Sequence, residues 1–489
     1  MKVVLHRSAS SDFPYQKSLP PLGLGYVAAY LKKRCWFAEV TYCHTTEEIL
    51  SSRPDVVGIS SASENFNEAI DTATRVKEAM NVPIFIGGVH ISLLPLTLPK
   101  CFDVGILCEG EHTIVDLINL YKLTAQLSPT ELSKIPGICY HDGNEVAVTG
   151  ERELIGELDE IPYPDREVLG FKWEMSPSRE IHMVTSRGCP YKCIFCASSK
   201  LWKRFRYFSP EYVAEEIDFI RQTYDPECIY FFDDLFVANP ARFRQICKLI
   251  KQRRLHEGIR FRTYARVNLV DTALADLFRE MNFFYIDFGF ESNVQSTLDY
   301  LNKQHASPEK NQRAIDLLHK RGISIGANVI IACPEETVED IMETYRFLEH
   351  NKDKIDRASF APLIPLPGTP VWEYAREQGI VSEWEIKWSR LRFDPHRTDL
   401  NAFPLLSKKV DREQLVEIVK TFRDLCREIE LVGQVKEYAR RLAQVRDRLS
   451  KLEYELSTIH GSKLFKTAWF LRNFMSRLWG RKDIRNTVK

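Results

Sequence analysis

Continuous runs of β-branched and aliphatic residues alternate with segments of helical periodicity over roughly the first 125 residues. Five of these runs have the length and apolar content of strands buried on both faces, and they span 2–6, 38–42, 55–60, 82–88 and 103–109. Apolar residues recur at helical spacing in the segments 22–33, 64–80 and 111–122. Strands joined by crossover helices predict an α/β fold, a doubly wound Rossmann-like or flavodoxin-like parallel sheet within residues 1–150.

A hairpin and a proline-rich connector follow this predicted domain. Asp142 and Gly143 form the two-residue turn signal of a hairpin within residues 137–150. Pro162 and Pro164 favour extended backbone, so we expect a domain boundary in a linker over residues 151–180.

Strand and helix patterns alternate again between residues 181 and 378. The six predicted strands span 182–186, 228–234, 260–268, 284–292, 323–332 and 358–366. Six successive units without a hairpin predict a curved parallel sheet, which is a partial (βα)6 barrel of TIM type. The ligand site of such a barrel lies at the carboxyl ends of its strands.

The C-terminal part divides into an extension over 379–430, irregular and then helical, and a tail over 431–489. In the tail, apolar residues alternate by three and four, which is the a/d pattern of a coiled coil; they are Val435, Tyr438, Leu442, Val445, Leu449, Leu452, Leu456 and Ile459. Residues 461–489 hold eight Lys/Arg against one Asp, interleaved with Trp469, Phe470, Phe474 and Trp479. Two interpretations stay open: peripheral contact with a membrane surface, or packing against the protein, a partner or a second copy.

Composition excludes several classes of function. The 489 residues carry 67 basic and 67 acidic side chains, so no net positive field attracts nucleic acid, and we expect no such partner. The longest apolar runs are shorter than the ~20 residues of a spanning helix, and the first residues do not form a secretory signal. We therefore expect a cytoplasmic protein, in which the 12 cysteines serve as thiols, core residues or metal ligands.

Three cysteines follow the first predicted barrel strand, in the stretch TSRGCPYKCIFC. Cys189, Cys193 and Cys196 are spaced C-x3-C-x2-C. Three thiolates on one short loop can hold three irons of a [4Fe–4S] cluster and leave the fourth iron open for chemistry. The alternative is a structural zinc site, which would require a fourth ligand and usually shows paired C-x2-C spacing.

With Phe195 before its third cysteine, this triplet resembles the signature of the radical S-adenosylmethionine superfamily, and the resemblance covers about residues 181–375. It implies that the open iron binds S-adenosylmethionine and that an electron from a donor such as flavodoxin or ferredoxin releases a 5′-deoxyadenosyl radical. It also implies that Phe195 and further residues bind this cofactor. Asp233 or Asp234 would accept from the cofactor's ammonium, the other capping nearby backbone.

Two more residues follow from the same resemblance. Arg266 would pair with the cofactor carboxylate or form a structural ion pair across the barrel, and Glu291 would orient polar cofactor groups or Arg266. The segment 328–337 departs from the family's glycine-rich pattern, whereas PLPGTP at 365–370 matches the expected end of the sixth strand.

The N-terminal domain resembles the cobalamin-binding domains that precede some radical S-adenosylmethionine cores, through the segments 20–31, 54–63, 84–90 and 108–113. Small residues at strand ends let a large ligand approach the backbone, so the resemblance implies cobalamin beside Ser60, Ser61, Ser63, Gly87, Gly88, His90 and Gly110. No D-x-H-x-x-G motif follows the first strand, which implies cobalamin without a histidine ligand from that motif. His90 is either a hydrogen-bonded pocket wall or, less commonly, a metal ligand.

Together these features predict a cobalamin-dependent radical S-adenosylmethionine enzyme, most simply a methyltransferase acting on an unactivated carbon of a small-molecule or lipid-like substrate. One alternative keeps both cofactors and performs a cyclisation or oxidative ring formation. A non-enzymatic alternative is a scaffold that acts through its coiled-coil tail. A methylthiotransferase would need a second cysteine triplet in the N-terminal domain, which the sequence lacks.

Overall fold

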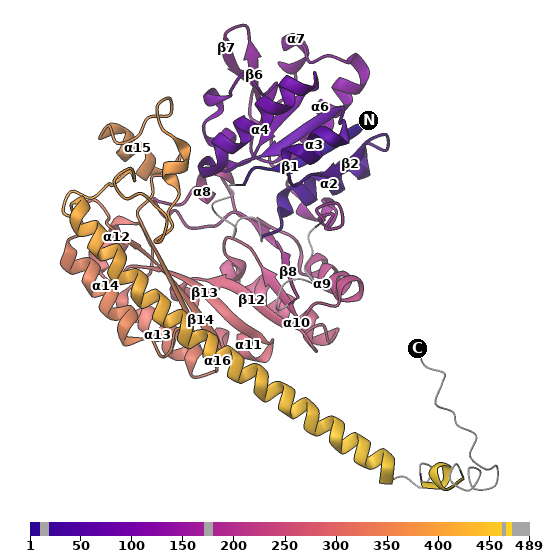
Figure 1. The fold of residues 1–489 in the computed structure, drawn as a ribbon, viewed down its shortest axis with the longest axis vertical. Coiled ribbons are helices and arrows are strands. Elements are labelled where there is room, and N and C mark those ends of the chain that lie inside the picture. The colour runs from indigo at the N-terminus through magenta and orange to yellow at the C-terminus, as the bar shows by residue number, and fades with distance from the viewer. Residues whose placement is uncertain (10–18, 171–178, 462–465, 472–489) are drawn as a thin grey trace, which may run out of the picture. The chain divides into compact units, whose positions relative to one another are not determined.

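The computed structural model describes residues 1–9, 19–170, 179–461 and 466–471 (Figure 1). The chain divides into two compact units, Met1–Ile429 and Glu430–Lys489, and each is described by itself.

The first unit begins with a seven-stranded sheet. Its strands are β1 (Lys2–Arg7), β2 (Glu39–Tyr42), β3 (Val56–Ser60), β4 (Ile84–Gly87), β5 (Val104–Ile106), β6 (Ile138–Asp142) and β7 (Glu145–Val148). The order is β2-β1-β3-β4-β5-β6-β7, with the first five parallel. This order confirms the doubly wound sheet, with a topological switch point between β1 and β3. The predicted hairpin, β6 and β7, extends the same sheet antiparallel to β5.

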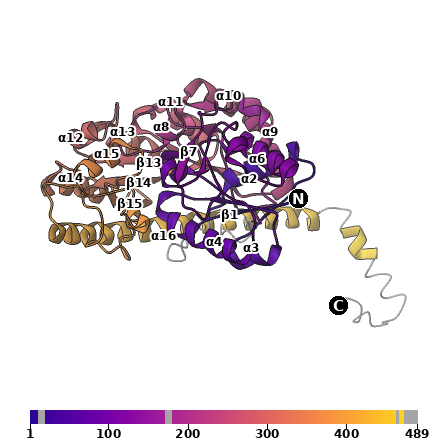
Figure 2. The same cartoon turned by 90° about the horizontal axis from the view of Figure 1, so that it is seen from above.

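Helices cover both faces of this sheet. They are α2 (Leu22–Arg34), α3 (Thr46–Ser52), α4 (Phe66–Ala79), α5 (Val89–Leu93), α6 (Gly110–Thr124) and α7 (Pro129–Leu132). Successive strand residues point to opposite faces. Val3 and Leu5 therefore join the core under α2 and α6, whereas Val4 joins the core under α3 and α4. Figure 2 shows α2 and α6 on one side of β1 and α3 and α4 on the other. Burial on both faces explains why the strands read as unbroken apolar runs.

The second sheet is the predicted partial barrel. Six parallel strands lie in the order β15-β14-β13-β12-β11-β8; they are β8 (Glu180–Met183), β11 (Cys228–Phe231), β12 (Arg260–Ala265), β13 (Phe283–Glu291), β14 (Ser324–Ile331) and β15 (Arg357–Pro362). β8 and β15 each pair with a single strand of this sheet, so the barrel is open between them. Several strands end earlier than predicted: β11, for example, stops at Phe231 and leaves Asp233 and Asp234 in the following loop.

Helices alternate with the barrel strands, and short elements follow β8. The helices are α9 (Pro210–Tyr224), α10 (Pro240–Gln252), α11 (Thr272–Glu280), α12 (Gln295–Tyr300), α13 (Pro308–His319), α14 (Val338–His350) and α15 (Pro370–Glu377). Side chains such as Ser209, Asp271 and Thr337 cap helix N-termini, which starts each helix at a defined residue. After β8 come β9 (Ser186–Arg187), α8 (Ser198–Leu201) and β10 (Arg206–Tyr207), with β9 and β10 paired antiparallel.

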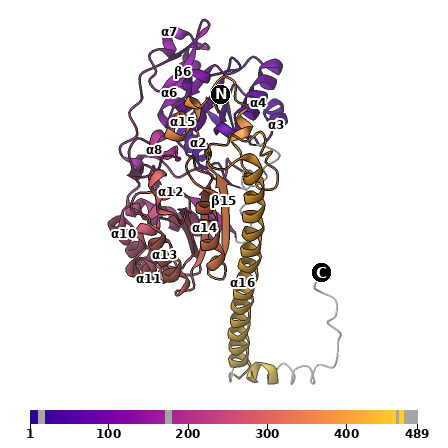
Figure 3. The same cartoon turned by 90° about the vertical axis from the view of Figure 1, so that its left-hand side faces the viewer.

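A long helix, α16 (Arg412–Gly461), follows the barrel and the extension. Up to Ile429 it belongs to the first unit and packs beside α14 and β15 (Figure 3). There the ring centroids of Phe422 and Phe360 lie 5.3 Å apart. In the second unit the eight predicted a/d side chains lie on one helix and are 47–68% exposed. Coiled-coil pairing stays a prediction, and Phe474 and Trp479 lie outside the described residues. Among the residues that are described, no helix combines the length and apolarity needed to cross a membrane.

Candidate functional site

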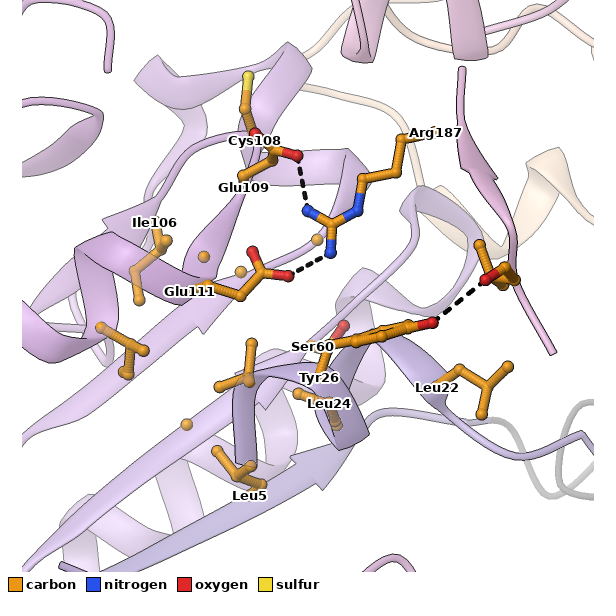
Figure 4. A pocket seen from close by; sticks show the side chains of 18 of the residues that line it. Leu5, Leu22, Leu24, Tyr26, Ser60, Ile106, Cys108, Glu109, Glu111 and Arg187 are labelled. Atoms are coloured by element: carbon orange, nitrogen blue, oxygen red, sulfur yellow. Dashed lines mark hydrogen bonds and ion pairs between the residues drawn. The ribbon is translucent and has the colours of Figure 1, made fainter. Parts of the chain in front are cut away.

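One cavity joins the carboxyl edge of the first sheet to the barrel (Figure 4). Its volume is about 320 Å³. From the N-terminal domain it is lined by residues at or near the ends of β1, β3, β4 and β5 and by the starts of α2 and α6, including Leu5, Leu22, Leu24, Tyr26, Gly58, Ser60, Gly87, Gly88, Ile106 and Gly110. From the barrel side come Val184, Ser186, Arg187, Gly188, Trp202, Phe232 and Asp234. The ligand-binding edges of both sheets therefore face the same space.

Of the residues predicted to contact cobalamin, four line this cavity: Ser60, Gly87, Gly88 and Gly110. Gly88 has φ +104°, and a Cβ there would lie 2.5 Å from the Ser61 carbonyl oxygen, so only glycine fits. The other three, Ser61, Ser63 and His90, are buried outside the lining. Their contact with cobalamin stays a prediction, because their side chains are buried in the protein core.

His90 is the most deeply buried of these three residues. Its ring is fully buried, stacks on Phe66 with a centroid distance of 3.6 Å, and meets the edge of Trp388. Nδ1 lies 3.0 Å from Ser63 Oγ and Nε2 lies 3.2 Å from Thr97 Oγ1, so both nitrogens have protein partners. His90 is thus neither a pocket wall nor placed as a metal ligand. Among the described residues that line the cavity there is no histidine.

Burial lowers the pKa of His90 from 6.5 to about 3. Below pH 6.5 the unfolded chain takes up a proton at this ring and the folded chain does not, so acid weakens the fold. We expect the wild type to lose about 2 kcal/mol more unfolding free energy between pH 8 and pH 5 than His90→Gln does. Urea unfolding of both proteins at the two pH values measures the difference; equal losses would show that His90 is not buried in its neutral form.

A buried ion network forms one wall of the cavity. Arg187 Nη1 donates to Glu109 Oε1 at 2.6 Å, and Arg187 Nη2 pairs with Glu111 (Figure 4). Arg206 also pairs with Glu109 at 2.9 Å, and Glu109 accepts from the Ile155 backbone N–H. The four charged side chains are 4–7% exposed. The network links the loop after β5 to the strand that precedes the cysteine triplet. Sequence reasoning missed it, although CEGE and TSRGC carry its charges.

Two hydrogen bonds to the segment after α12 hold the cysteine loop. The Ile194 N–H donates to the Leu301 carbonyl at 3.2 Å, and Asn302 Nδ2 donates to the Lys192 carbonyl at 2.6 Å. Cys193 is buried, whereas Cys189 and Cys196 are partly exposed. Phe195, partly buried, packs against the core shared by α4 and the segment around Trp388. The backbone of the loop is therefore fixed by the segment after α12.

Arg266 contacts Cys193, one of the three cysteines of the loop, directly. Its Nη1 lies 3.3 Å from Cys193 Sγ, Nη2 donates to the Gln304 carbonyl at 2.9 Å, and the guanidinium lies 3.7 Å from the Tyr191 ring centroid. Within the described residues it meets no carboxylate, so the predicted structural ion pair is not formed. The geometry instead makes Arg266 a support for the cysteine loop.

The two aspartates have different surroundings. Asp233 is buried, and its Oδ1 accepts from the Thr185 N–H and hydroxyl and from Ser186 Oγ at 2.5–3.0 Å; burial raises its pKa to about 6. Asp234 lines the cavity and accepts from Ser198 Oγ at 2.5 Å. Asp233 therefore ties the end of β11 to the start of the cysteine loop, whereas Asp234 is the one of the two that lines the cavity.

Glu291 does not orient Arg266. It has φ +63° and pairs with Lys303 at 2.5 Å, and both side chains are buried at the carboxyl end of β13. The alternative in which Glu291 contacts Arg266 is thus corrected: Lys303 supplies the cation.

The donor set of the loop fits a cluster better than a single ion. Among the described residues no group of three or more His, Cys, Asp or Glu side chains could share one metal ion. A four-iron cluster has a different requirement, because each thiolate binds its own iron. Three thiols on one supported loop meet that requirement in number and chemistry.

Comparisons with known proteins identify the family. The Radical SAM superfamily profile matches residues 183–348, and the B12 binding domain profile matches residues 15–118. An uncharacterized methyltransferase of Pyrococcus horikoshii is 32% identical over 73% of this chain and 78% of its own length. The chain belongs to the cobalamin-dependent radical S-adenosylmethionine enzymes.

More distant relatives differ in the reactions that their names state. Cytidylyl-2-hydroxyethylphosphonate methyltransferase of Streptomyces wedmorensis is 26% identical over 75% of this chain and 79% of its own length. The anaerobic magnesium-protoporphyrin IX monomethyl ester cyclase of Cereibacter sphaeroides is 27% identical over 74% of this chain, which spans 61% of that protein. The solved structure of the methyltransferase TsrM from Kitasatospora setae, with cobalamin and a [4Fe–4S] cluster bound, has the same fold, with a TM-score of 0.67, 16% identity and 88% of each chain covered.

Proposed function

We propose that this enzyme is a methyltransferase that transfers a methyl group to an unactivated carbon of a small-molecule substrate. The observation that carries the proposal is the shared cavity, which has the carboxyl edge of the B12-type sheet on one side and the start of the cysteine loop and Asp234 on the other. Methyltransferases among the relatives support the same reaction class. When bound, the cluster and S-adenosylmethionine supply a 5′-deoxyadenosyl radical, and cobalamin supplies the methyl group.

The cysteine loop, Arg266 and the lining of the cavity each have a role in this proposal. Cys189, Cys193 and Cys196 hold the cluster, while Arg266 keeps Cys193 in place through the contact at 3.3 Å. Asp234 accepts from the ammonium group of S-adenosylmethionine, because a carboxylate facing the cavity is the natural partner for a cation. The apolar walls around Leu24 exclude water from a reactive radical. An external reductant of the flavodoxin or ferredoxin class delivers the electron.

Small residues at the strand ends and the volume of two adjoining cavities support the cobalamin part of the proposal. Ser60, Gly87, Gly88 and Gly110 leave the strand ends open to a large ligand. A second cavity of about 520 Å³ shares Cys108 and Glu109 with the first, so the two together offer more room than either alone for a corrin ring and its nucleotide tail. The described residues that line the first cavity include no histidine, and the proposal places cobalamin there without a histidine ligand.

Filling the cavity at Gly87 tests the cobalamin site. A Cβ at Gly87 would meet only Ile106, at 3.9 Å, so alanine fits, whereas a leucine side chain projects into the space for the ligand. We expect Gly87→Leu to fold and to weaken corrinoid binding at least about tenfold, the loss expected for a clash of ~1.4 kcal/mol or more. Titration with hydroxocobalamin, followed by absorbance, measures it. Gly87→Ala is the control, and unchanged binding by Gly87→Leu would place the corrinoid elsewhere.

The reaction is tested by the fate of the methyl group. Reconstituted enzyme is incubated anaerobically with a chemical reductant, a small-molecule extract and S-adenosylmethionine carrying a CD3 group. A product in which one CD3 group replaces a hydrogen, together with 5′-deoxyadenosine, supports a radical methyltransferase. A product that forms a ring and gains no label supports the second candidate, the cyclase or oxidative ring-forming reaction, which the cyclase relatives favour.

Deletion of the tail, residues 431–489, distinguishes between the enzyme and the scaffold hypotheses. The described part of residues 431–489 lies in a compact unit of its own. Loss of turnover after deletion of this segment would tie the tail to the chemistry, whereas retained turnover would leave it a role in assembly, including the peripheral membrane contact considered above.

A further inference from the structure

The second unit presents an exposed apolar seam along one side of α16. The a positions Val435, Leu442, Leu449 and Leu456 and the d positions Tyr438, Val445, Leu452 and Ile459 lie on one side of α16 and are 47–68% exposed. A continuous row of half-exposed Leu, Val and Ile side chains is unusual on a free surface and is typical of a helix that packs against another.

We propose that this seam pairs with the same seam of a second copy of the chain, as an antiparallel coiled coil. In an antiparallel pair each a residue faces a d residue of the partner, and the flanking positions e and g face e and g of the partner. The register that places Leu449 opposite Leu452 of the second copy also places Leu442 opposite Ile459 and Val445 opposite Leu456. Every layer of the overlap is then aliphatic.

The flanking charges select this register. Positions e and g that border the overlap carry Arg446, Arg448, Glu453 and Glu455. In the stated register Arg446 faces Glu453 of the second copy and Arg448 faces its Glu455, and symmetry repeats both pairs. All four flanking contacts are therefore attractive.

Neighbouring antiparallel registers and the parallel arrangement bring like charges together. Moving the antiparallel pair by one heptad in one direction places Arg448 opposite itself, and in the other direction it places Glu455 opposite itself. A parallel, in-register pair keeps Arg448 beside Glu453 but sets Arg441 against Arg446 of the second copy. Like charges at these positions destabilise the pairing, so the stated register is the one that charge complementarity favours.

The ion pairs within the helix agree with this assignment. Arg441 pairs with Glu437 at 2.9 Å and Lys451 pairs with Asp447 at 2.8 Å along the same helix. Within the described residues, Arg446, Arg448, Glu453 and Glu455 have no such partner. The charges that flank the seam are thus the ones left for a second helix.

Charge reversal tests the proposal on the full chain. One variant carries Glu453→Arg and Glu455→Arg, and a second carries Arg446→Glu and Arg448→Glu. Each turns all four flanking contacts into repulsions and should raise the dissociation constant of the dimer about 100-fold, whereas mixing the two variants should restore a dimer. Light scattering after size-exclusion chromatography gives the masses. Circular dichroism checks that the helix persists, and Tyr454→Ala, at the outer f position, is the matched control.

Cross-linking tests the direction. In the antiparallel register position 449 faces position 452 of the second copy, so a mixture of Leu449→Cys and Leu452→Cys chains should form a disulfide-linked dimer above the wild-type background. A wild type that is monomeric at micromolar concentration would overturn the proposal. So would a dimer that both charge variants retain, or a cross-link that Leu449→Cys forms efficiently with itself. None of these outcomes bears on the methyltransferase reaction.

Discussion

Replacing Cys189, Cys193 and Cys196 together by alanine is expected to abolish the iron–sulfur absorbance and all turnover while corrinoid binding remains. The reason is that thiolates are the protein ligands through which a four-iron cluster is held, and the three lie on one loop. The proposed corrinoid contacts come from the ends of β1, β3, β4 and β5, which belong to another sheet. Its binding therefore does not require the cysteines themselves.

The measurement is the absorbance spectrum after anaerobic reconstitution with iron, sulfide and hydroxocobalamin. Cys101→Ala is the matched control, because Cys101 is another partly exposed free cysteine and lies outside the loop. It should keep both absorbances. An iron–sulfur spectrum in the triple variant would refute the assignment of the ligands. Loss of the corrinoid as well would mean that the N-terminal cavity depends on a loaded cluster loop.

Replacing Arg187 by methionine is expected to lower the unfolding free energy by about 3–5 kcal/mol, the cost of breaking a buried ion pair by removing one partner. Glu109 and Glu111 would remain almost completely buried, and Glu111 would lose the cation beside it. Arg206 still reaches Glu109, so Glu111 carries most of the loss. Urea unfolding of the purified proteins measures the change.

Two further variants separate charge from packing. Arg187→Met combined with Glu109→Gln and Glu111→Gln removes the uncompensated charges and should recover most of the lost stability. Arg346→Met removes an exposed arginine that pairs with Glu339 and Glu343, and it should have little effect on unfolding. If Arg187→Met were as stable as the wild type, water would be reaching Glu111, and the wall of the cavity would be open.

The Arg187 network also matters for how the two halves of the site meet. Arg187 lies two residues before Cys189, and its partners Glu109 and Glu111 flank Gly110, which lines the proposed cobalamin cavity. The same ion pairs that hold the β5 loop thus anchor the start of the cysteine loop. A site in which a radical and a methyl donor must reach one substrate depends on such fixed spacing.

Local pattern was sufficient for the two sheets and for the cysteine triplet. Continuous apolar runs identified the strands because parallel strands are buried on both faces, and strand–helix alternation permits few topologies. Small residues at strand ends likewise located Ser60, Gly87, Gly88 and Gly110 at the cavity. The ends of strands were less predictable. β5 ends at Ile106, and Cys108 then takes φ +58°, a backbone conformation that the apolar run over 103–109 does not reveal.

The sequence by itself therefore determined the order of strands and helices, the resemblance to a family and the ligands expected for a cluster, because each depends on residues that are near neighbours in the chain. Only the tertiary structure decided which charges meet. Arg187 pairs with Glu109, 78 positions away in the sequence, and Arg266 contacts Cys193, 73 positions away. The His90 side chain is buried in the core, and Lys303 pairs with Glu291. Such contacts depend on how separate elements pack against one another, and side-chain periodicity along one element carries no information about its distant neighbours.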